Sequence, residues 1–415
     1  MSAPKSEIPS SEQWTLIRNA RQLLTLQGAS GPRRGPALSQ LGIVSGGVIL
    51  IRNGLIEDVG PARRVENLAG SRHAHEIDAA GKIVMPAFCD PDRALIAPEN
   101  IEGHGSSAAA GFRKTSRKRV LGLATNSVSE CVQYGCLTVG SHSGVAGDLK
   151  SVLKLLRTHR LIQSKPLRIR SILSLRITSE DGGSDAALLE LLANVWMPSV
   201  HRDNLASVAE FTLGGPHPDE DLPLVRRAAV AAATQGFTLR LRSLDVPQPA
   251  LLQLALASGA MAIVAPPDSL RAFAGPLAAL GCVRVIPVSA AFDQPDQAAV
   301  NLRNTINEGS AIALASGSPS RRQFSTANIQ FILHLAVERL GLTPEEAIMA
   351  VSYNAACALR MSRATGSLEP GKSADILIMD VPDYRDLARR AGHHDLSLVL
   401  HAGRVIWRAA PLILD

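Results

Sequence analysis

The sequence predicts an α/β protein in which a TIM-like (β/α)8 barrel is inserted into a small β-sandwich domain built from both termini. Both ends of the 415-residue chain carry strand patterns, whereas the middle alternates short apolar runs with helical stretches, as βαβ units do. The length exceeds one ordinary domain and suits a large barrel with a smaller partner. We therefore divide the chain into a disordered N-terminus (residues 1–12), a composite β domain (13–86 with 364–415) and a barrel (87–363).

The composition is typical of a well-packed globular protein, since 46% of the residues are apolar and 19% are charged. Only 3% are aromatic, which argues against the ring-lined surfaces that bind bases or sugars. The sequence shows no apolar leader and no apolar stretch of membrane length, and its 5 cysteines have no zinc-finger spacing. We expect a cytoplasmic protein with reduced thiols that binds neither nucleic acid nor a membrane.

One dense basic cluster stands out against the net charge of +6: Arg113, Lys114, Arg117, Lys118 and Arg119. This cluster is either a patch that binds anions or nucleic acid, or a solvated face of a helix or loop. No nucleic-acid-binding motif accompanies it, so the solvated face is the favoured interpretation.

The N-terminal part of the composite domain has a clear β pattern. It begins with a strand-like run at residues 14–26 and continues with a loop rich in Gly, Pro, Ser and Arg at 28–47. Residues 48–60 predict a hairpin, because the Asn53-Gly54 pair tolerates the positive φ of a tight turn. A further β run covers residues 76–86.

The middle of the chain predicts barrel strands separated by helices. The strands fall at residues 136–140, 169–175, 238–241, 260–264, 283–288 and 311–315, and helices at 148–160, 222–235 and 250–258. The clearest helix covers 325–340, where apolar residues form a single stripe from Ile329 onward. Thr343 predicts the N-cap of the next helix, with Glu346 completing a capping box. Strands return at 374–380, 396–401 and 404–407, which completes the composite domain.

Several runs resemble those of the amidohydrolase superfamily, and of imidazolonepropionases in particular. Residues 77–90, IDAAGKIVMPAFCD, are similar to the family's approach to barrel strand one, and residues 134–139, YGCLTV, resemble its second strand. Residues 313–359 resemble the final strand and the helices that follow it, including GLTPEEA at 341–347. Residues 366–376, GSLEPGKSADI, resemble the return to the β domain. The resemblance spans nearly the whole chain and implies the fold predicted above.

The resemblance also implies a hydrolase of cyclic amide, non-peptide C–N bonds that holds zinc or iron at the mouth of its barrel. The family's ligands are histidines on strands one, five and six and an aspartate on strand eight. In this chain these positions are degenerate, and they carry Asp92 and Ala94 on strand one, Arg240 or Arg242 on strand five, Ala265 on strand six, and Gly317 or Ser316 on strand eight. Alanine and guanidinium groups offer no lone pair to a cation, and a zinc site needs about three protein ligands. We therefore predict that the zinc or iron of the family is absent.

Several side chains at the mouth are still candidates for chemistry. Asp92, His142 and Glu210 are weak candidates for acid–base catalysis, although a lone histidine is more often structural. Arg176, Arg240 and Arg242 are weak candidates for binding an anion. The structural alternative is that an arginine here simply neutralises Asp90 or Asp92.

Three functions remain open. The first is a catalytically inactive or strongly altered member of the family with a binding or assembly role, for which inactive dihydroorotase-like subunits are a precedent in the superfamily. The lost ligands favour this function, or the third below, over the second. The second is an active hydrolase of cyclic amide C–N bonds, and the third is a protein that binds a small anion. A protein partner or a homodimer is compatible with the first.

Overall fold

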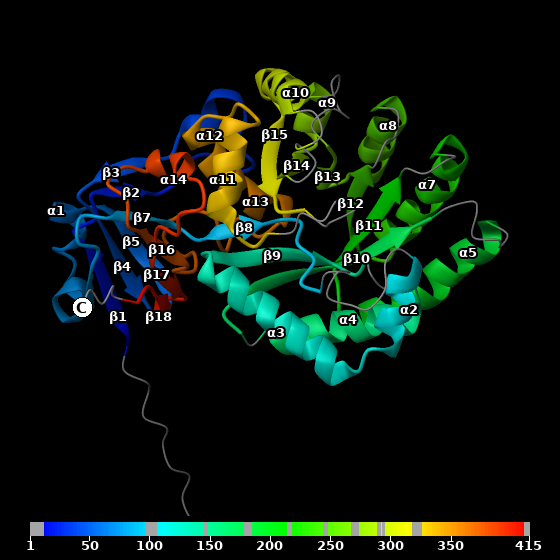
Figure 1. The fold of residues 1–415 in the computed structure, drawn as a ribbon, viewed down its shortest axis with the longest axis horizontal. Coiled ribbons are helices and arrows are strands. Elements are labelled where there is room, and N and C mark those ends of the chain that lie inside the picture. The colour runs from blue at the N-terminus through cyan, green and yellow to red at the C-terminus, as the bar shows by residue number, and fades with distance from the viewer. Residues whose placement is uncertain are drawn as a thin grey trace, which may run out of the picture.

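Two β-sheets made from both ends of the chain lie beside a barrel in the computed structural model of the protein, which describes residues 12–96, 106–144, 148–163, 165–177, 185–213, 218–243, 248–266, 274–288, 292, 295–317 and 326–410. Figure 1 shows the sheets at one end of the molecule and the barrel at the other. All but the last residue of the predicted disordered segment, 1–12, lies outside the described residues. Within the described ranges, no helix is both long and apolar enough to cross a membrane.

Eight parallel strands form the barrel sheet, and they follow one another along the sheet as they do along the chain. They are β8 (Phe88–Asp90), β9 (Cys136–His142), β10 (Arg168–Arg176), β11 (Val208–Leu213), β12 (Thr238–Ser243), β13 (Ala262–Val264), β14 (Val283–Pro287) and β15 (Ala311–Ala315). The barrel prediction is therefore confirmed. Periodicity predicted all of these strands except β8, which the family resemblance placed, and β11, whose bounds the sequence analysis did not give.

Helices cover the outside of the barrel (Figure 1). They are α2 (Ser106–Lys114), α3 (Arg117–Gln133), α4 (Leu149–Ile162), α5 (Asp185–Leu191), a π-helical turn (Leu192–Trp196), α6 (Met197–Arg202), α7 (Pro218–Thr234), α8 (Gln248–Ser258), α9 (Ala274–Ala279), α10 (Pro295–Asn307), α11 (Ile329–Glu338) and α12 (Pro344–Ala350). The predicted capping box of α12 is confirmed, because Glu346 N donates to Thr343 Oγ1 at 3.3 Å and Thr343 N donates to Glu346 Oε2 at 2.9 Å.

The barrel sheet is nearly closed, with a seam between its first and last strands, β8 and β15, which do not pair. A short helix, α13 (Tyr353–Ala358), packs beside the seam, and its alanines join the apolar interior of the barrel. A side chain also crosses the seam, since Oδ1 of Asp90 accepts a hydrogen bond from the backbone N–H of Ser316 at 3.2 Å. The seam thus brings the ends of β8 and β15 together at the mouth.

The composite domain consists of two sheets that enclose an apolar core, to which Leu23, Ile49 and Leu398 belong. One sheet has the order β5 (Leu55–Pro61), β4 (Gly47–Arg52), β1 (Trp14–Arg18), β6 (His75–Asp78). The other has the order β18 (Arg404–Arg408), β17 (Leu396–His401), β16 (Ile376–Met379), β7 (Ile83–Pro86), β2 (Gln22–Leu24), β3 (Ile43–Ser45). The second sheet contains strands from both ends of the chain, as predicted.

Local predictions in this domain succeeded where turn chemistry was strong. Asn53 and Gly54 have φ of 50° and 84°, which is the left-handed geometry that the predicted hairpin requires. The predicted loop at 28–47 was partly wrong, because it holds a 3-10 turn at Gly35–Ser39 and strand β3. Strand β3 pairs antiparallel with β2. Its extended conformation depends on this pairing with a separate segment, and the composition of residues 28–47 does not indicate such a partner.

Candidate functional site

Three neighbouring barrel strands bring polar side chains to one level inside the barrel. In the parallel register, Ser174 of β10 pairs with Glu210 of β11, and Glu210 pairs with Arg240 of β12. Paired residues of parallel strands project from the same face of the sheet, and alternation places Arg242, two residues beyond Arg240, on that face as well. The register alone therefore gathers one carboxylate and two guanidinium groups inside the barrel.

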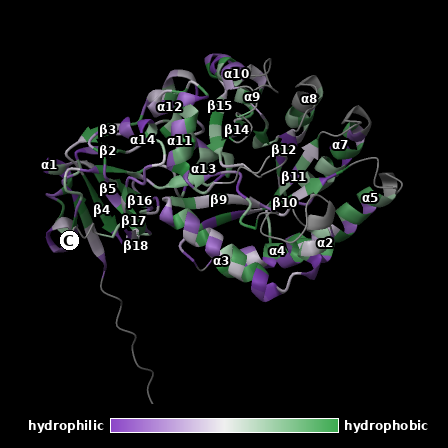
Figure 2. Ribbon diagram, viewed as in Figure 1, coloured by the Kyte–Doolittle hydropathy of each residue, from purple (hydrophilic) through white to green (hydrophobic). Residues whose placement is uncertain are grey.

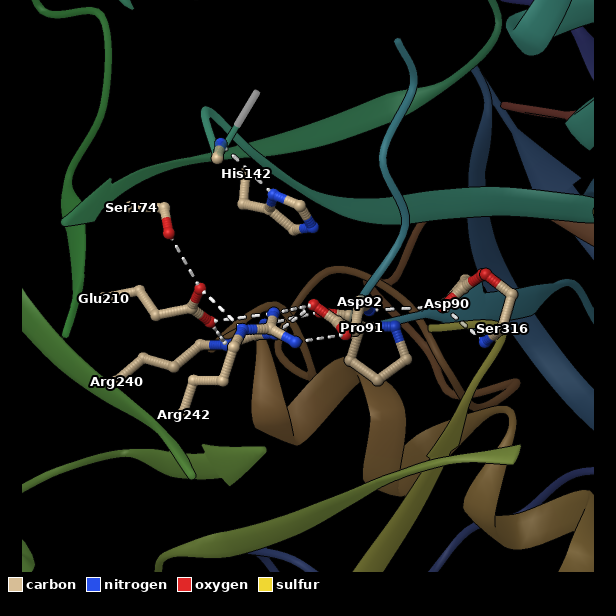
Figure 3. Close-up of polar contacts among 10 residues, drawn as sticks. Asp90, Pro91, Asp92, His142, Ser174, Glu210, Arg240, Arg242 and Ser316 are labelled. Carbon is tan, nitrogen blue, oxygen red and sulfur yellow. Dashed lines mark hydrogen bonds and ion pairs between the residues drawn. The ribbon is translucent and has the colours of Figure 1, made fainter. Parts of the chain in front are cut away.

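Asp92 completes this cluster from the first strand. It follows β8 closely, and its Oδ1 atom accepts hydrogen bonds from Nη2 of Arg240 and from Nη2 of Arg242, both at 2.5 Å. Nη1 of Arg242 donates to Asp92 Oδ2 at 3.1 Å, and Nη1 of Arg240 donates to the carbonyl oxygen of Pro91 at 2.5 Å. We call Asp92, Glu210, Arg240 and Arg242 the mouth network, and Figure 3 shows the two guanidinium groups between the two carboxylates.

Glu210 holds the other side of both arginines. Nε of Arg240 lies 2.6 Å from Glu210 Oε2, an ion pair whose angle is poor for a hydrogen bond. Nε and Nη2 of Arg242 donate to Oε1 and Oε2 of Glu210 at 3.0 and 3.2 Å, and Ser174 Oγ donates to Oε1 at 3.1 Å. The side chains of Asp92, Glu210 and Arg240 are 0% exposed, and that of Arg242 is 15% exposed. The mouth network is thus a buried ionic cluster.

The charges of the mouth network cancel. Burial alone raises the pKa of the Asp92 and Glu210 carboxyls, but attraction to Arg242 and Arg240 outweighs burial and holds both pKa values below their usual range. Burial also lowers the pKa of Arg242, and the two carboxylates reverse this and raise it. At neutral pH the mouth network therefore carries two positive and two negative charges, with no excess of either sign.

Asp90 is not the carboxylate that the arginines neutralise. Its Oδ1 accepts hydrogen bonds from the backbone N–H groups of Asp92, at 3.1 Å, and Ser316, and its Oδ2 has no hydrogen-bond partner among the described residues. Burial raises the pKa of this carboxyl. Of the two alternatives left open by the sequence, Asp92 is therefore the ion-pair partner, and Asp90 has a structural position at the seam.

The remaining predicted residues lie outside the mouth network. His142 ends β9, its Nδ1 accepts the backbone N–H of Gly144 at 3.3 Å, and its Nε2 has no hydrogen-bond partner in the described part of the chain. Burial, together with repulsion from Arg242, lowers the pKa of His142. Arg176 is exposed at the end of β10, and no ion pair joins it to another described residue. The network thus unites four of the six weak candidates and excludes these two.

Two parts of the site were missed by the sequence analysis. Ser174 donates a hydrogen bond to Glu210, and its place as the one polar residue between Ile172 and Leu175 of β10 was a usable signal for it. The carbonyl of Pro91 also accepts a hydrogen bond from Arg240, and a backbone acceptor of this kind leaves no trace in side-chain chemistry.

The residues at the mouth do not fit the metal ion of the family. Both guanidinium groups already donate to Asp92, the one predicted ligand position that carries a carboxylate (Figure 3). Ala94, Ala265 and Gly317, at three further predicted ligand positions, have no side-chain donor atom. No group of three or more His, Cys, Asp or Glu side chains within the described ranges is placed to hold an ion. A divalent cation at Asp92 would face two fixed positive charges.

Gly140 of β9 lets the loop that carries Asp92 approach the sheet. A Cβ atom at residue 140 would lie 2.5 Å from the carbonyl oxygen of Pro91. We expect Gly140→Ala to lower the free energy of unfolding by about 1–3 kcal/mol, because the added methyl overfills the site. Urea unfolding followed by circular dichroism measures this change.

The matched control for this variant is Gly122→Ala. Gly122 is exposed in α3, and a Cβ atom there meets nothing within 4 Å. This variant is expected to be neutral or stabilised by up to about 1 kcal/mol, because alanine favours the helix. If Gly140→Ala and Gly122→Ala have equal free energies of unfolding, the close approach of Pro91 to Gly140 does not limit the stability of the protein.

Comparisons with known proteins agree with this architecture. The model of the amidohydrolase family matches residues 296–406. The chain is 32% identical to an imidazolonepropionase of Solibacter usitatus, over 94% of this chain and 98% of the relative. It is 28% identical to imidazolonepropionases of Porphyromonas gingivalis and Geobacillus kaustophilus, in each case over 94% of this chain and 97% of the relative.

Solved structures share the fold at lower sequence identity. An ochratoxinase from A. niger superposes with a TM-score of 0.71 at 15% identity, covering 96% of each chain. A putative prolidase from Bifidobacterium longum superposes with a TM-score of 0.65 at 19% identity, covering 97% of this chain and 96% of the other. These likenesses extend over the barrel and the composite domain together.

Proposed function

This chain belongs to the amidohydrolase superfamily and is imidazolonepropionase-like, and from that premise we propose that it is catalytically inactive as a metal-dependent hydrolase and has a binding or assembly role. The observation that carries this proposal is the pair of 2.5 Å hydrogen bonds from Arg240 and Arg242 to Oδ1 of Asp92. In an amidohydrolase, a metal at this mouth polarises the amide carbonyl and lowers the pKa of its bound water to about 7. The arginines supply positive charge here, but they cannot bind a water oxygen as a Lewis acid does.

The mouth network also lacks a strong base. Asp92 and Glu210 are committed to the arginines, and their lowered pKa values make them weak proton acceptors at neutral pH. The positive charges have no excess to stabilise a developing oxyanion, because each is matched by a carboxylate. The network is better suited to holding β8, β11 and β12 together than to hydrolysis.

An anion-binding role for Arg176, Arg240 and Arg242 is less favoured by this geometry. Arg240 is fully buried, and both arginines of the mouth network donate to carboxylates. An incoming anion would meet the negative charges of Asp92 and Glu210 at the same place. Arg176 alone remains exposed, and a single exposed arginine does not define a pocket.

Metal analysis together with an assay on imidazolonepropionate, the compound for which the relatives are named, tests the proposal. The full chain is purified from cells supplied with zinc, iron, manganese and cobalt, beside the Geobacillus kaustophilus relative prepared in the same way. We expect the relative to retain metal and hydrolyse the compound, and this chain to retain far less than one equivalent and to give no hydrolysis above background.

The Asp92→Asn variant tests whether any hydrolysis that is measured comes from this chain or from a contaminating enzyme. Stoichiometric metal in the wild-type chain, with hydrolysis that Asp92→Asn abolishes, would overturn the proposal and establish an active hydrolase. Hydrolysis that persists unchanged in Asp92→Asn would point to a contaminating enzyme, because Asp92 is the one predicted ligand position that carries a carboxylate.

A further inference from the structure

A second candidate site lies on the outer wall of the barrel, away from the mouth network. It is a groove of about 370 Å³ lined by Arg117, Leu149, Lys150, Leu153, Lys154 and Arg157. We call it the α3/α4 groove, because Arg117 begins α3 and the other five residues lie on α4. Its volume falls within the range of small-molecule sites, about 300–1,000 Å³. The basic cluster seen in the sequence reaches it, and Figure 2 shows hydrophilic residues gathered where α2 passes into α3.

The groove has positive charge that the described residues do not balance. Arg117 and Lys150 are exposed, and no described carboxylate forms an ion pair with either. Arg117, Lys150 and Lys154 line the same groove. Burial lowers the pKa of Lys154, attraction to Asp148 opposes this change, and repulsion from Lys150 and Arg117 adds to it. An anion bound beside Arg117 and Lys150 would relieve this repulsion.

The other two cations already have partners. The ammonium of Lys154 donates to the carbonyl oxygens of Phe112 and Thr115 at 2.5 and 2.9 Å. Arg157 pairs with Asp203 at 2.8 Å. Lys154 and Arg157 therefore shape the groove, and Arg117 and Lys150 are the groups available to a ligand.

The N-terminus of α3 adds to the positive potential. Arg117 is the first residue of α3, whose first turn has no acidic residue, whereas α4 is capped by Asp148, whose carboxylate accepts a hydrogen bond from Ser151 N. The positive end of a helix dipole favours an anion and disfavours cations, yet α3 begins with Arg117, Lys118 and Arg119. This arrangement is unfavourable for a free helix and favourable for a helix that meets an anion.

The groove also has an apolar side. Leu149 and Leu153 are half-buried on the exposed face of α4, one turn apart. From Leu149 to Arg157 the helix rises by about 12 Å, which is the length available to a ligand. A bare inorganic anion would leave the leucines in water, whereas an extended apolar body would cover them.

We propose that the α3/α4 groove binds a small amphiphilic anion. Its phosphate or carboxylate head lies against Arg117 and Lys150 near the start of α3, and its apolar body lies along Leu149 and Leu153. The groove is on the outside of the barrel, so this inference does not depend on whether the mouth is catalytic.

Isothermal titration of the full chain tests the site with four probes: decyl phosphate below its micellar concentration, decanoate, inorganic phosphate, and vesicles containing anionic phospholipid. We expect saturable binding of one decyl phosphate or decanoate per chain, weakened by added salt. Inorganic phosphate is expected to bind at least about tenfold more weakly, since it leaves Leu149 and Leu153 exposed.

Variants locate the binding and separate it from net charge. Lys150→Glu and Arg117→Gln are each expected to weaken decyl phosphate binding by about tenfold. The control is Lys165→Glu, which makes the same charge change as Lys150→Glu at an exposed residue just beyond α4, outside the groove. Leu153→Ser is expected to weaken decyl phosphate while leaving inorganic phosphate unchanged.

Several outcomes would overturn the proposal. The first is that neither decyl phosphate nor decanoate binds. The second is that inorganic phosphate binds as tightly as decyl phosphate does. The third is that Lys150→Glu and Lys165→Glu weaken decyl phosphate binding equally. Binding to vesicles without binding to monomeric amphiphiles would assign the basic cluster to a membrane surface instead. Unchanged circular dichroism of the exposed-residue variants verifies that each is folded.

Discussion

Arg240→Met is expected to lower the free energy of unfolding by about 3–5 kcal/mol, the cost of leaving a buried charge without its partner. Arg240 is fully buried and contacts Asp92, Glu210 and the carbonyl of Pro91. Its removal leaves two buried carboxylates with only Arg242 to neutralise them. Urea unfolding of the variant and the wild type, followed by far-ultraviolet circular dichroism, measures the difference.

A double variant tests whether charge balance is the cause. Glu210→Gln alone is also expected to be destabilising, because two guanidinium groups then face only Asp92. In Arg240→Met/Glu210→Gln, the remaining pair of Arg242 and Asp92 is neutral again. We therefore expect the double variant to lose much less stability than the sum of the single variants. Additive losses would mean that packing, and not charge, dominates at the mouth network.

An exposed ion pair supplies the reference for this experiment. Arg18 lies 3.2 Å from Glu76, and the side chains are 41% and 53% exposed. Arg18→Met should cost no more than about 1 kcal/mol, because solvent screens such a pair. If Arg18→Met lowers the free energy of unfolding as much as Arg240→Met does, burial does not determine the cost of breaking these ion pairs.

The protein is expected to lose stability on acidification below about pH 6.5, and His159 is the principal cause. This residue of α4 is fully buried with its Nε2 3.2 Å from Ser141 Oγ, and burial lowers its pKa to about 3. A histidine in the unfolded chain takes up a proton near pH 6.5, whereas His159 in the folded chain stays neutral until about pH 3. Between these values, falling pH therefore favours the unfolded state, by up to about 1.4 kcal/mol per pH unit.

Comparison with His159→Gln isolates this effect. Between about pH 6 and 4.5, the unfolding free energy of the variant should depend less steeply on pH than that of the wild type. The difference in slope corresponds to close to one proton taken up on unfolding. His142, whose pKa is also lowered, steepens the slope of both proteins, and Asp90, whose pKa is raised, acts in the opposite sense in both. Equal slopes for His159→Gln and wild type would contradict the assignment. The carboxyls of Asp92 and Glu210 have lowered pKa values in the folded chain, so they stabilise the folded state while Asp and Glu of the unfolded chain are ionised. Below about pH 4 the unfolded carboxylates take up protons, and this contribution to the free energy of unfolding is lost.

The sequence predicted best those helices and turns whose signals come from residues close together in the chain. The apolar stripe from Ile329 and the Thr343 cap predicted two helices, and Asn53-Gly54 predicted a hairpin. The first predicted helix, 325–340, is shorter in the structure, with its N-cap at Asn328, whose side chain accepts a hydrogen bond from Phe331 N. The run at 76–86 covers most of β6 and all of β7, which belong to different sheets, and periodicity cannot assign a strand to a sheet.

The sequence by itself predicted the barrel and the composite domain, because their strands and helices follow from periodicity together with the resemblance to a known family. That resemblance also predicted Ala94, Ala265 and Gly317 as ligand positions, and the chemistry of single side chains shows that none of the three has a side-chain donor for a metal. Only the tertiary structure decided that Asp92, and not Asp90, receives both guanidinium groups. Arg240 and Asp92 are 148 residues apart, and their contact depends on strand register across the barrel. Burial, which makes their charges costly to leave unpaired, is likewise a property of the whole fold, since many distant side chains together exclude the water.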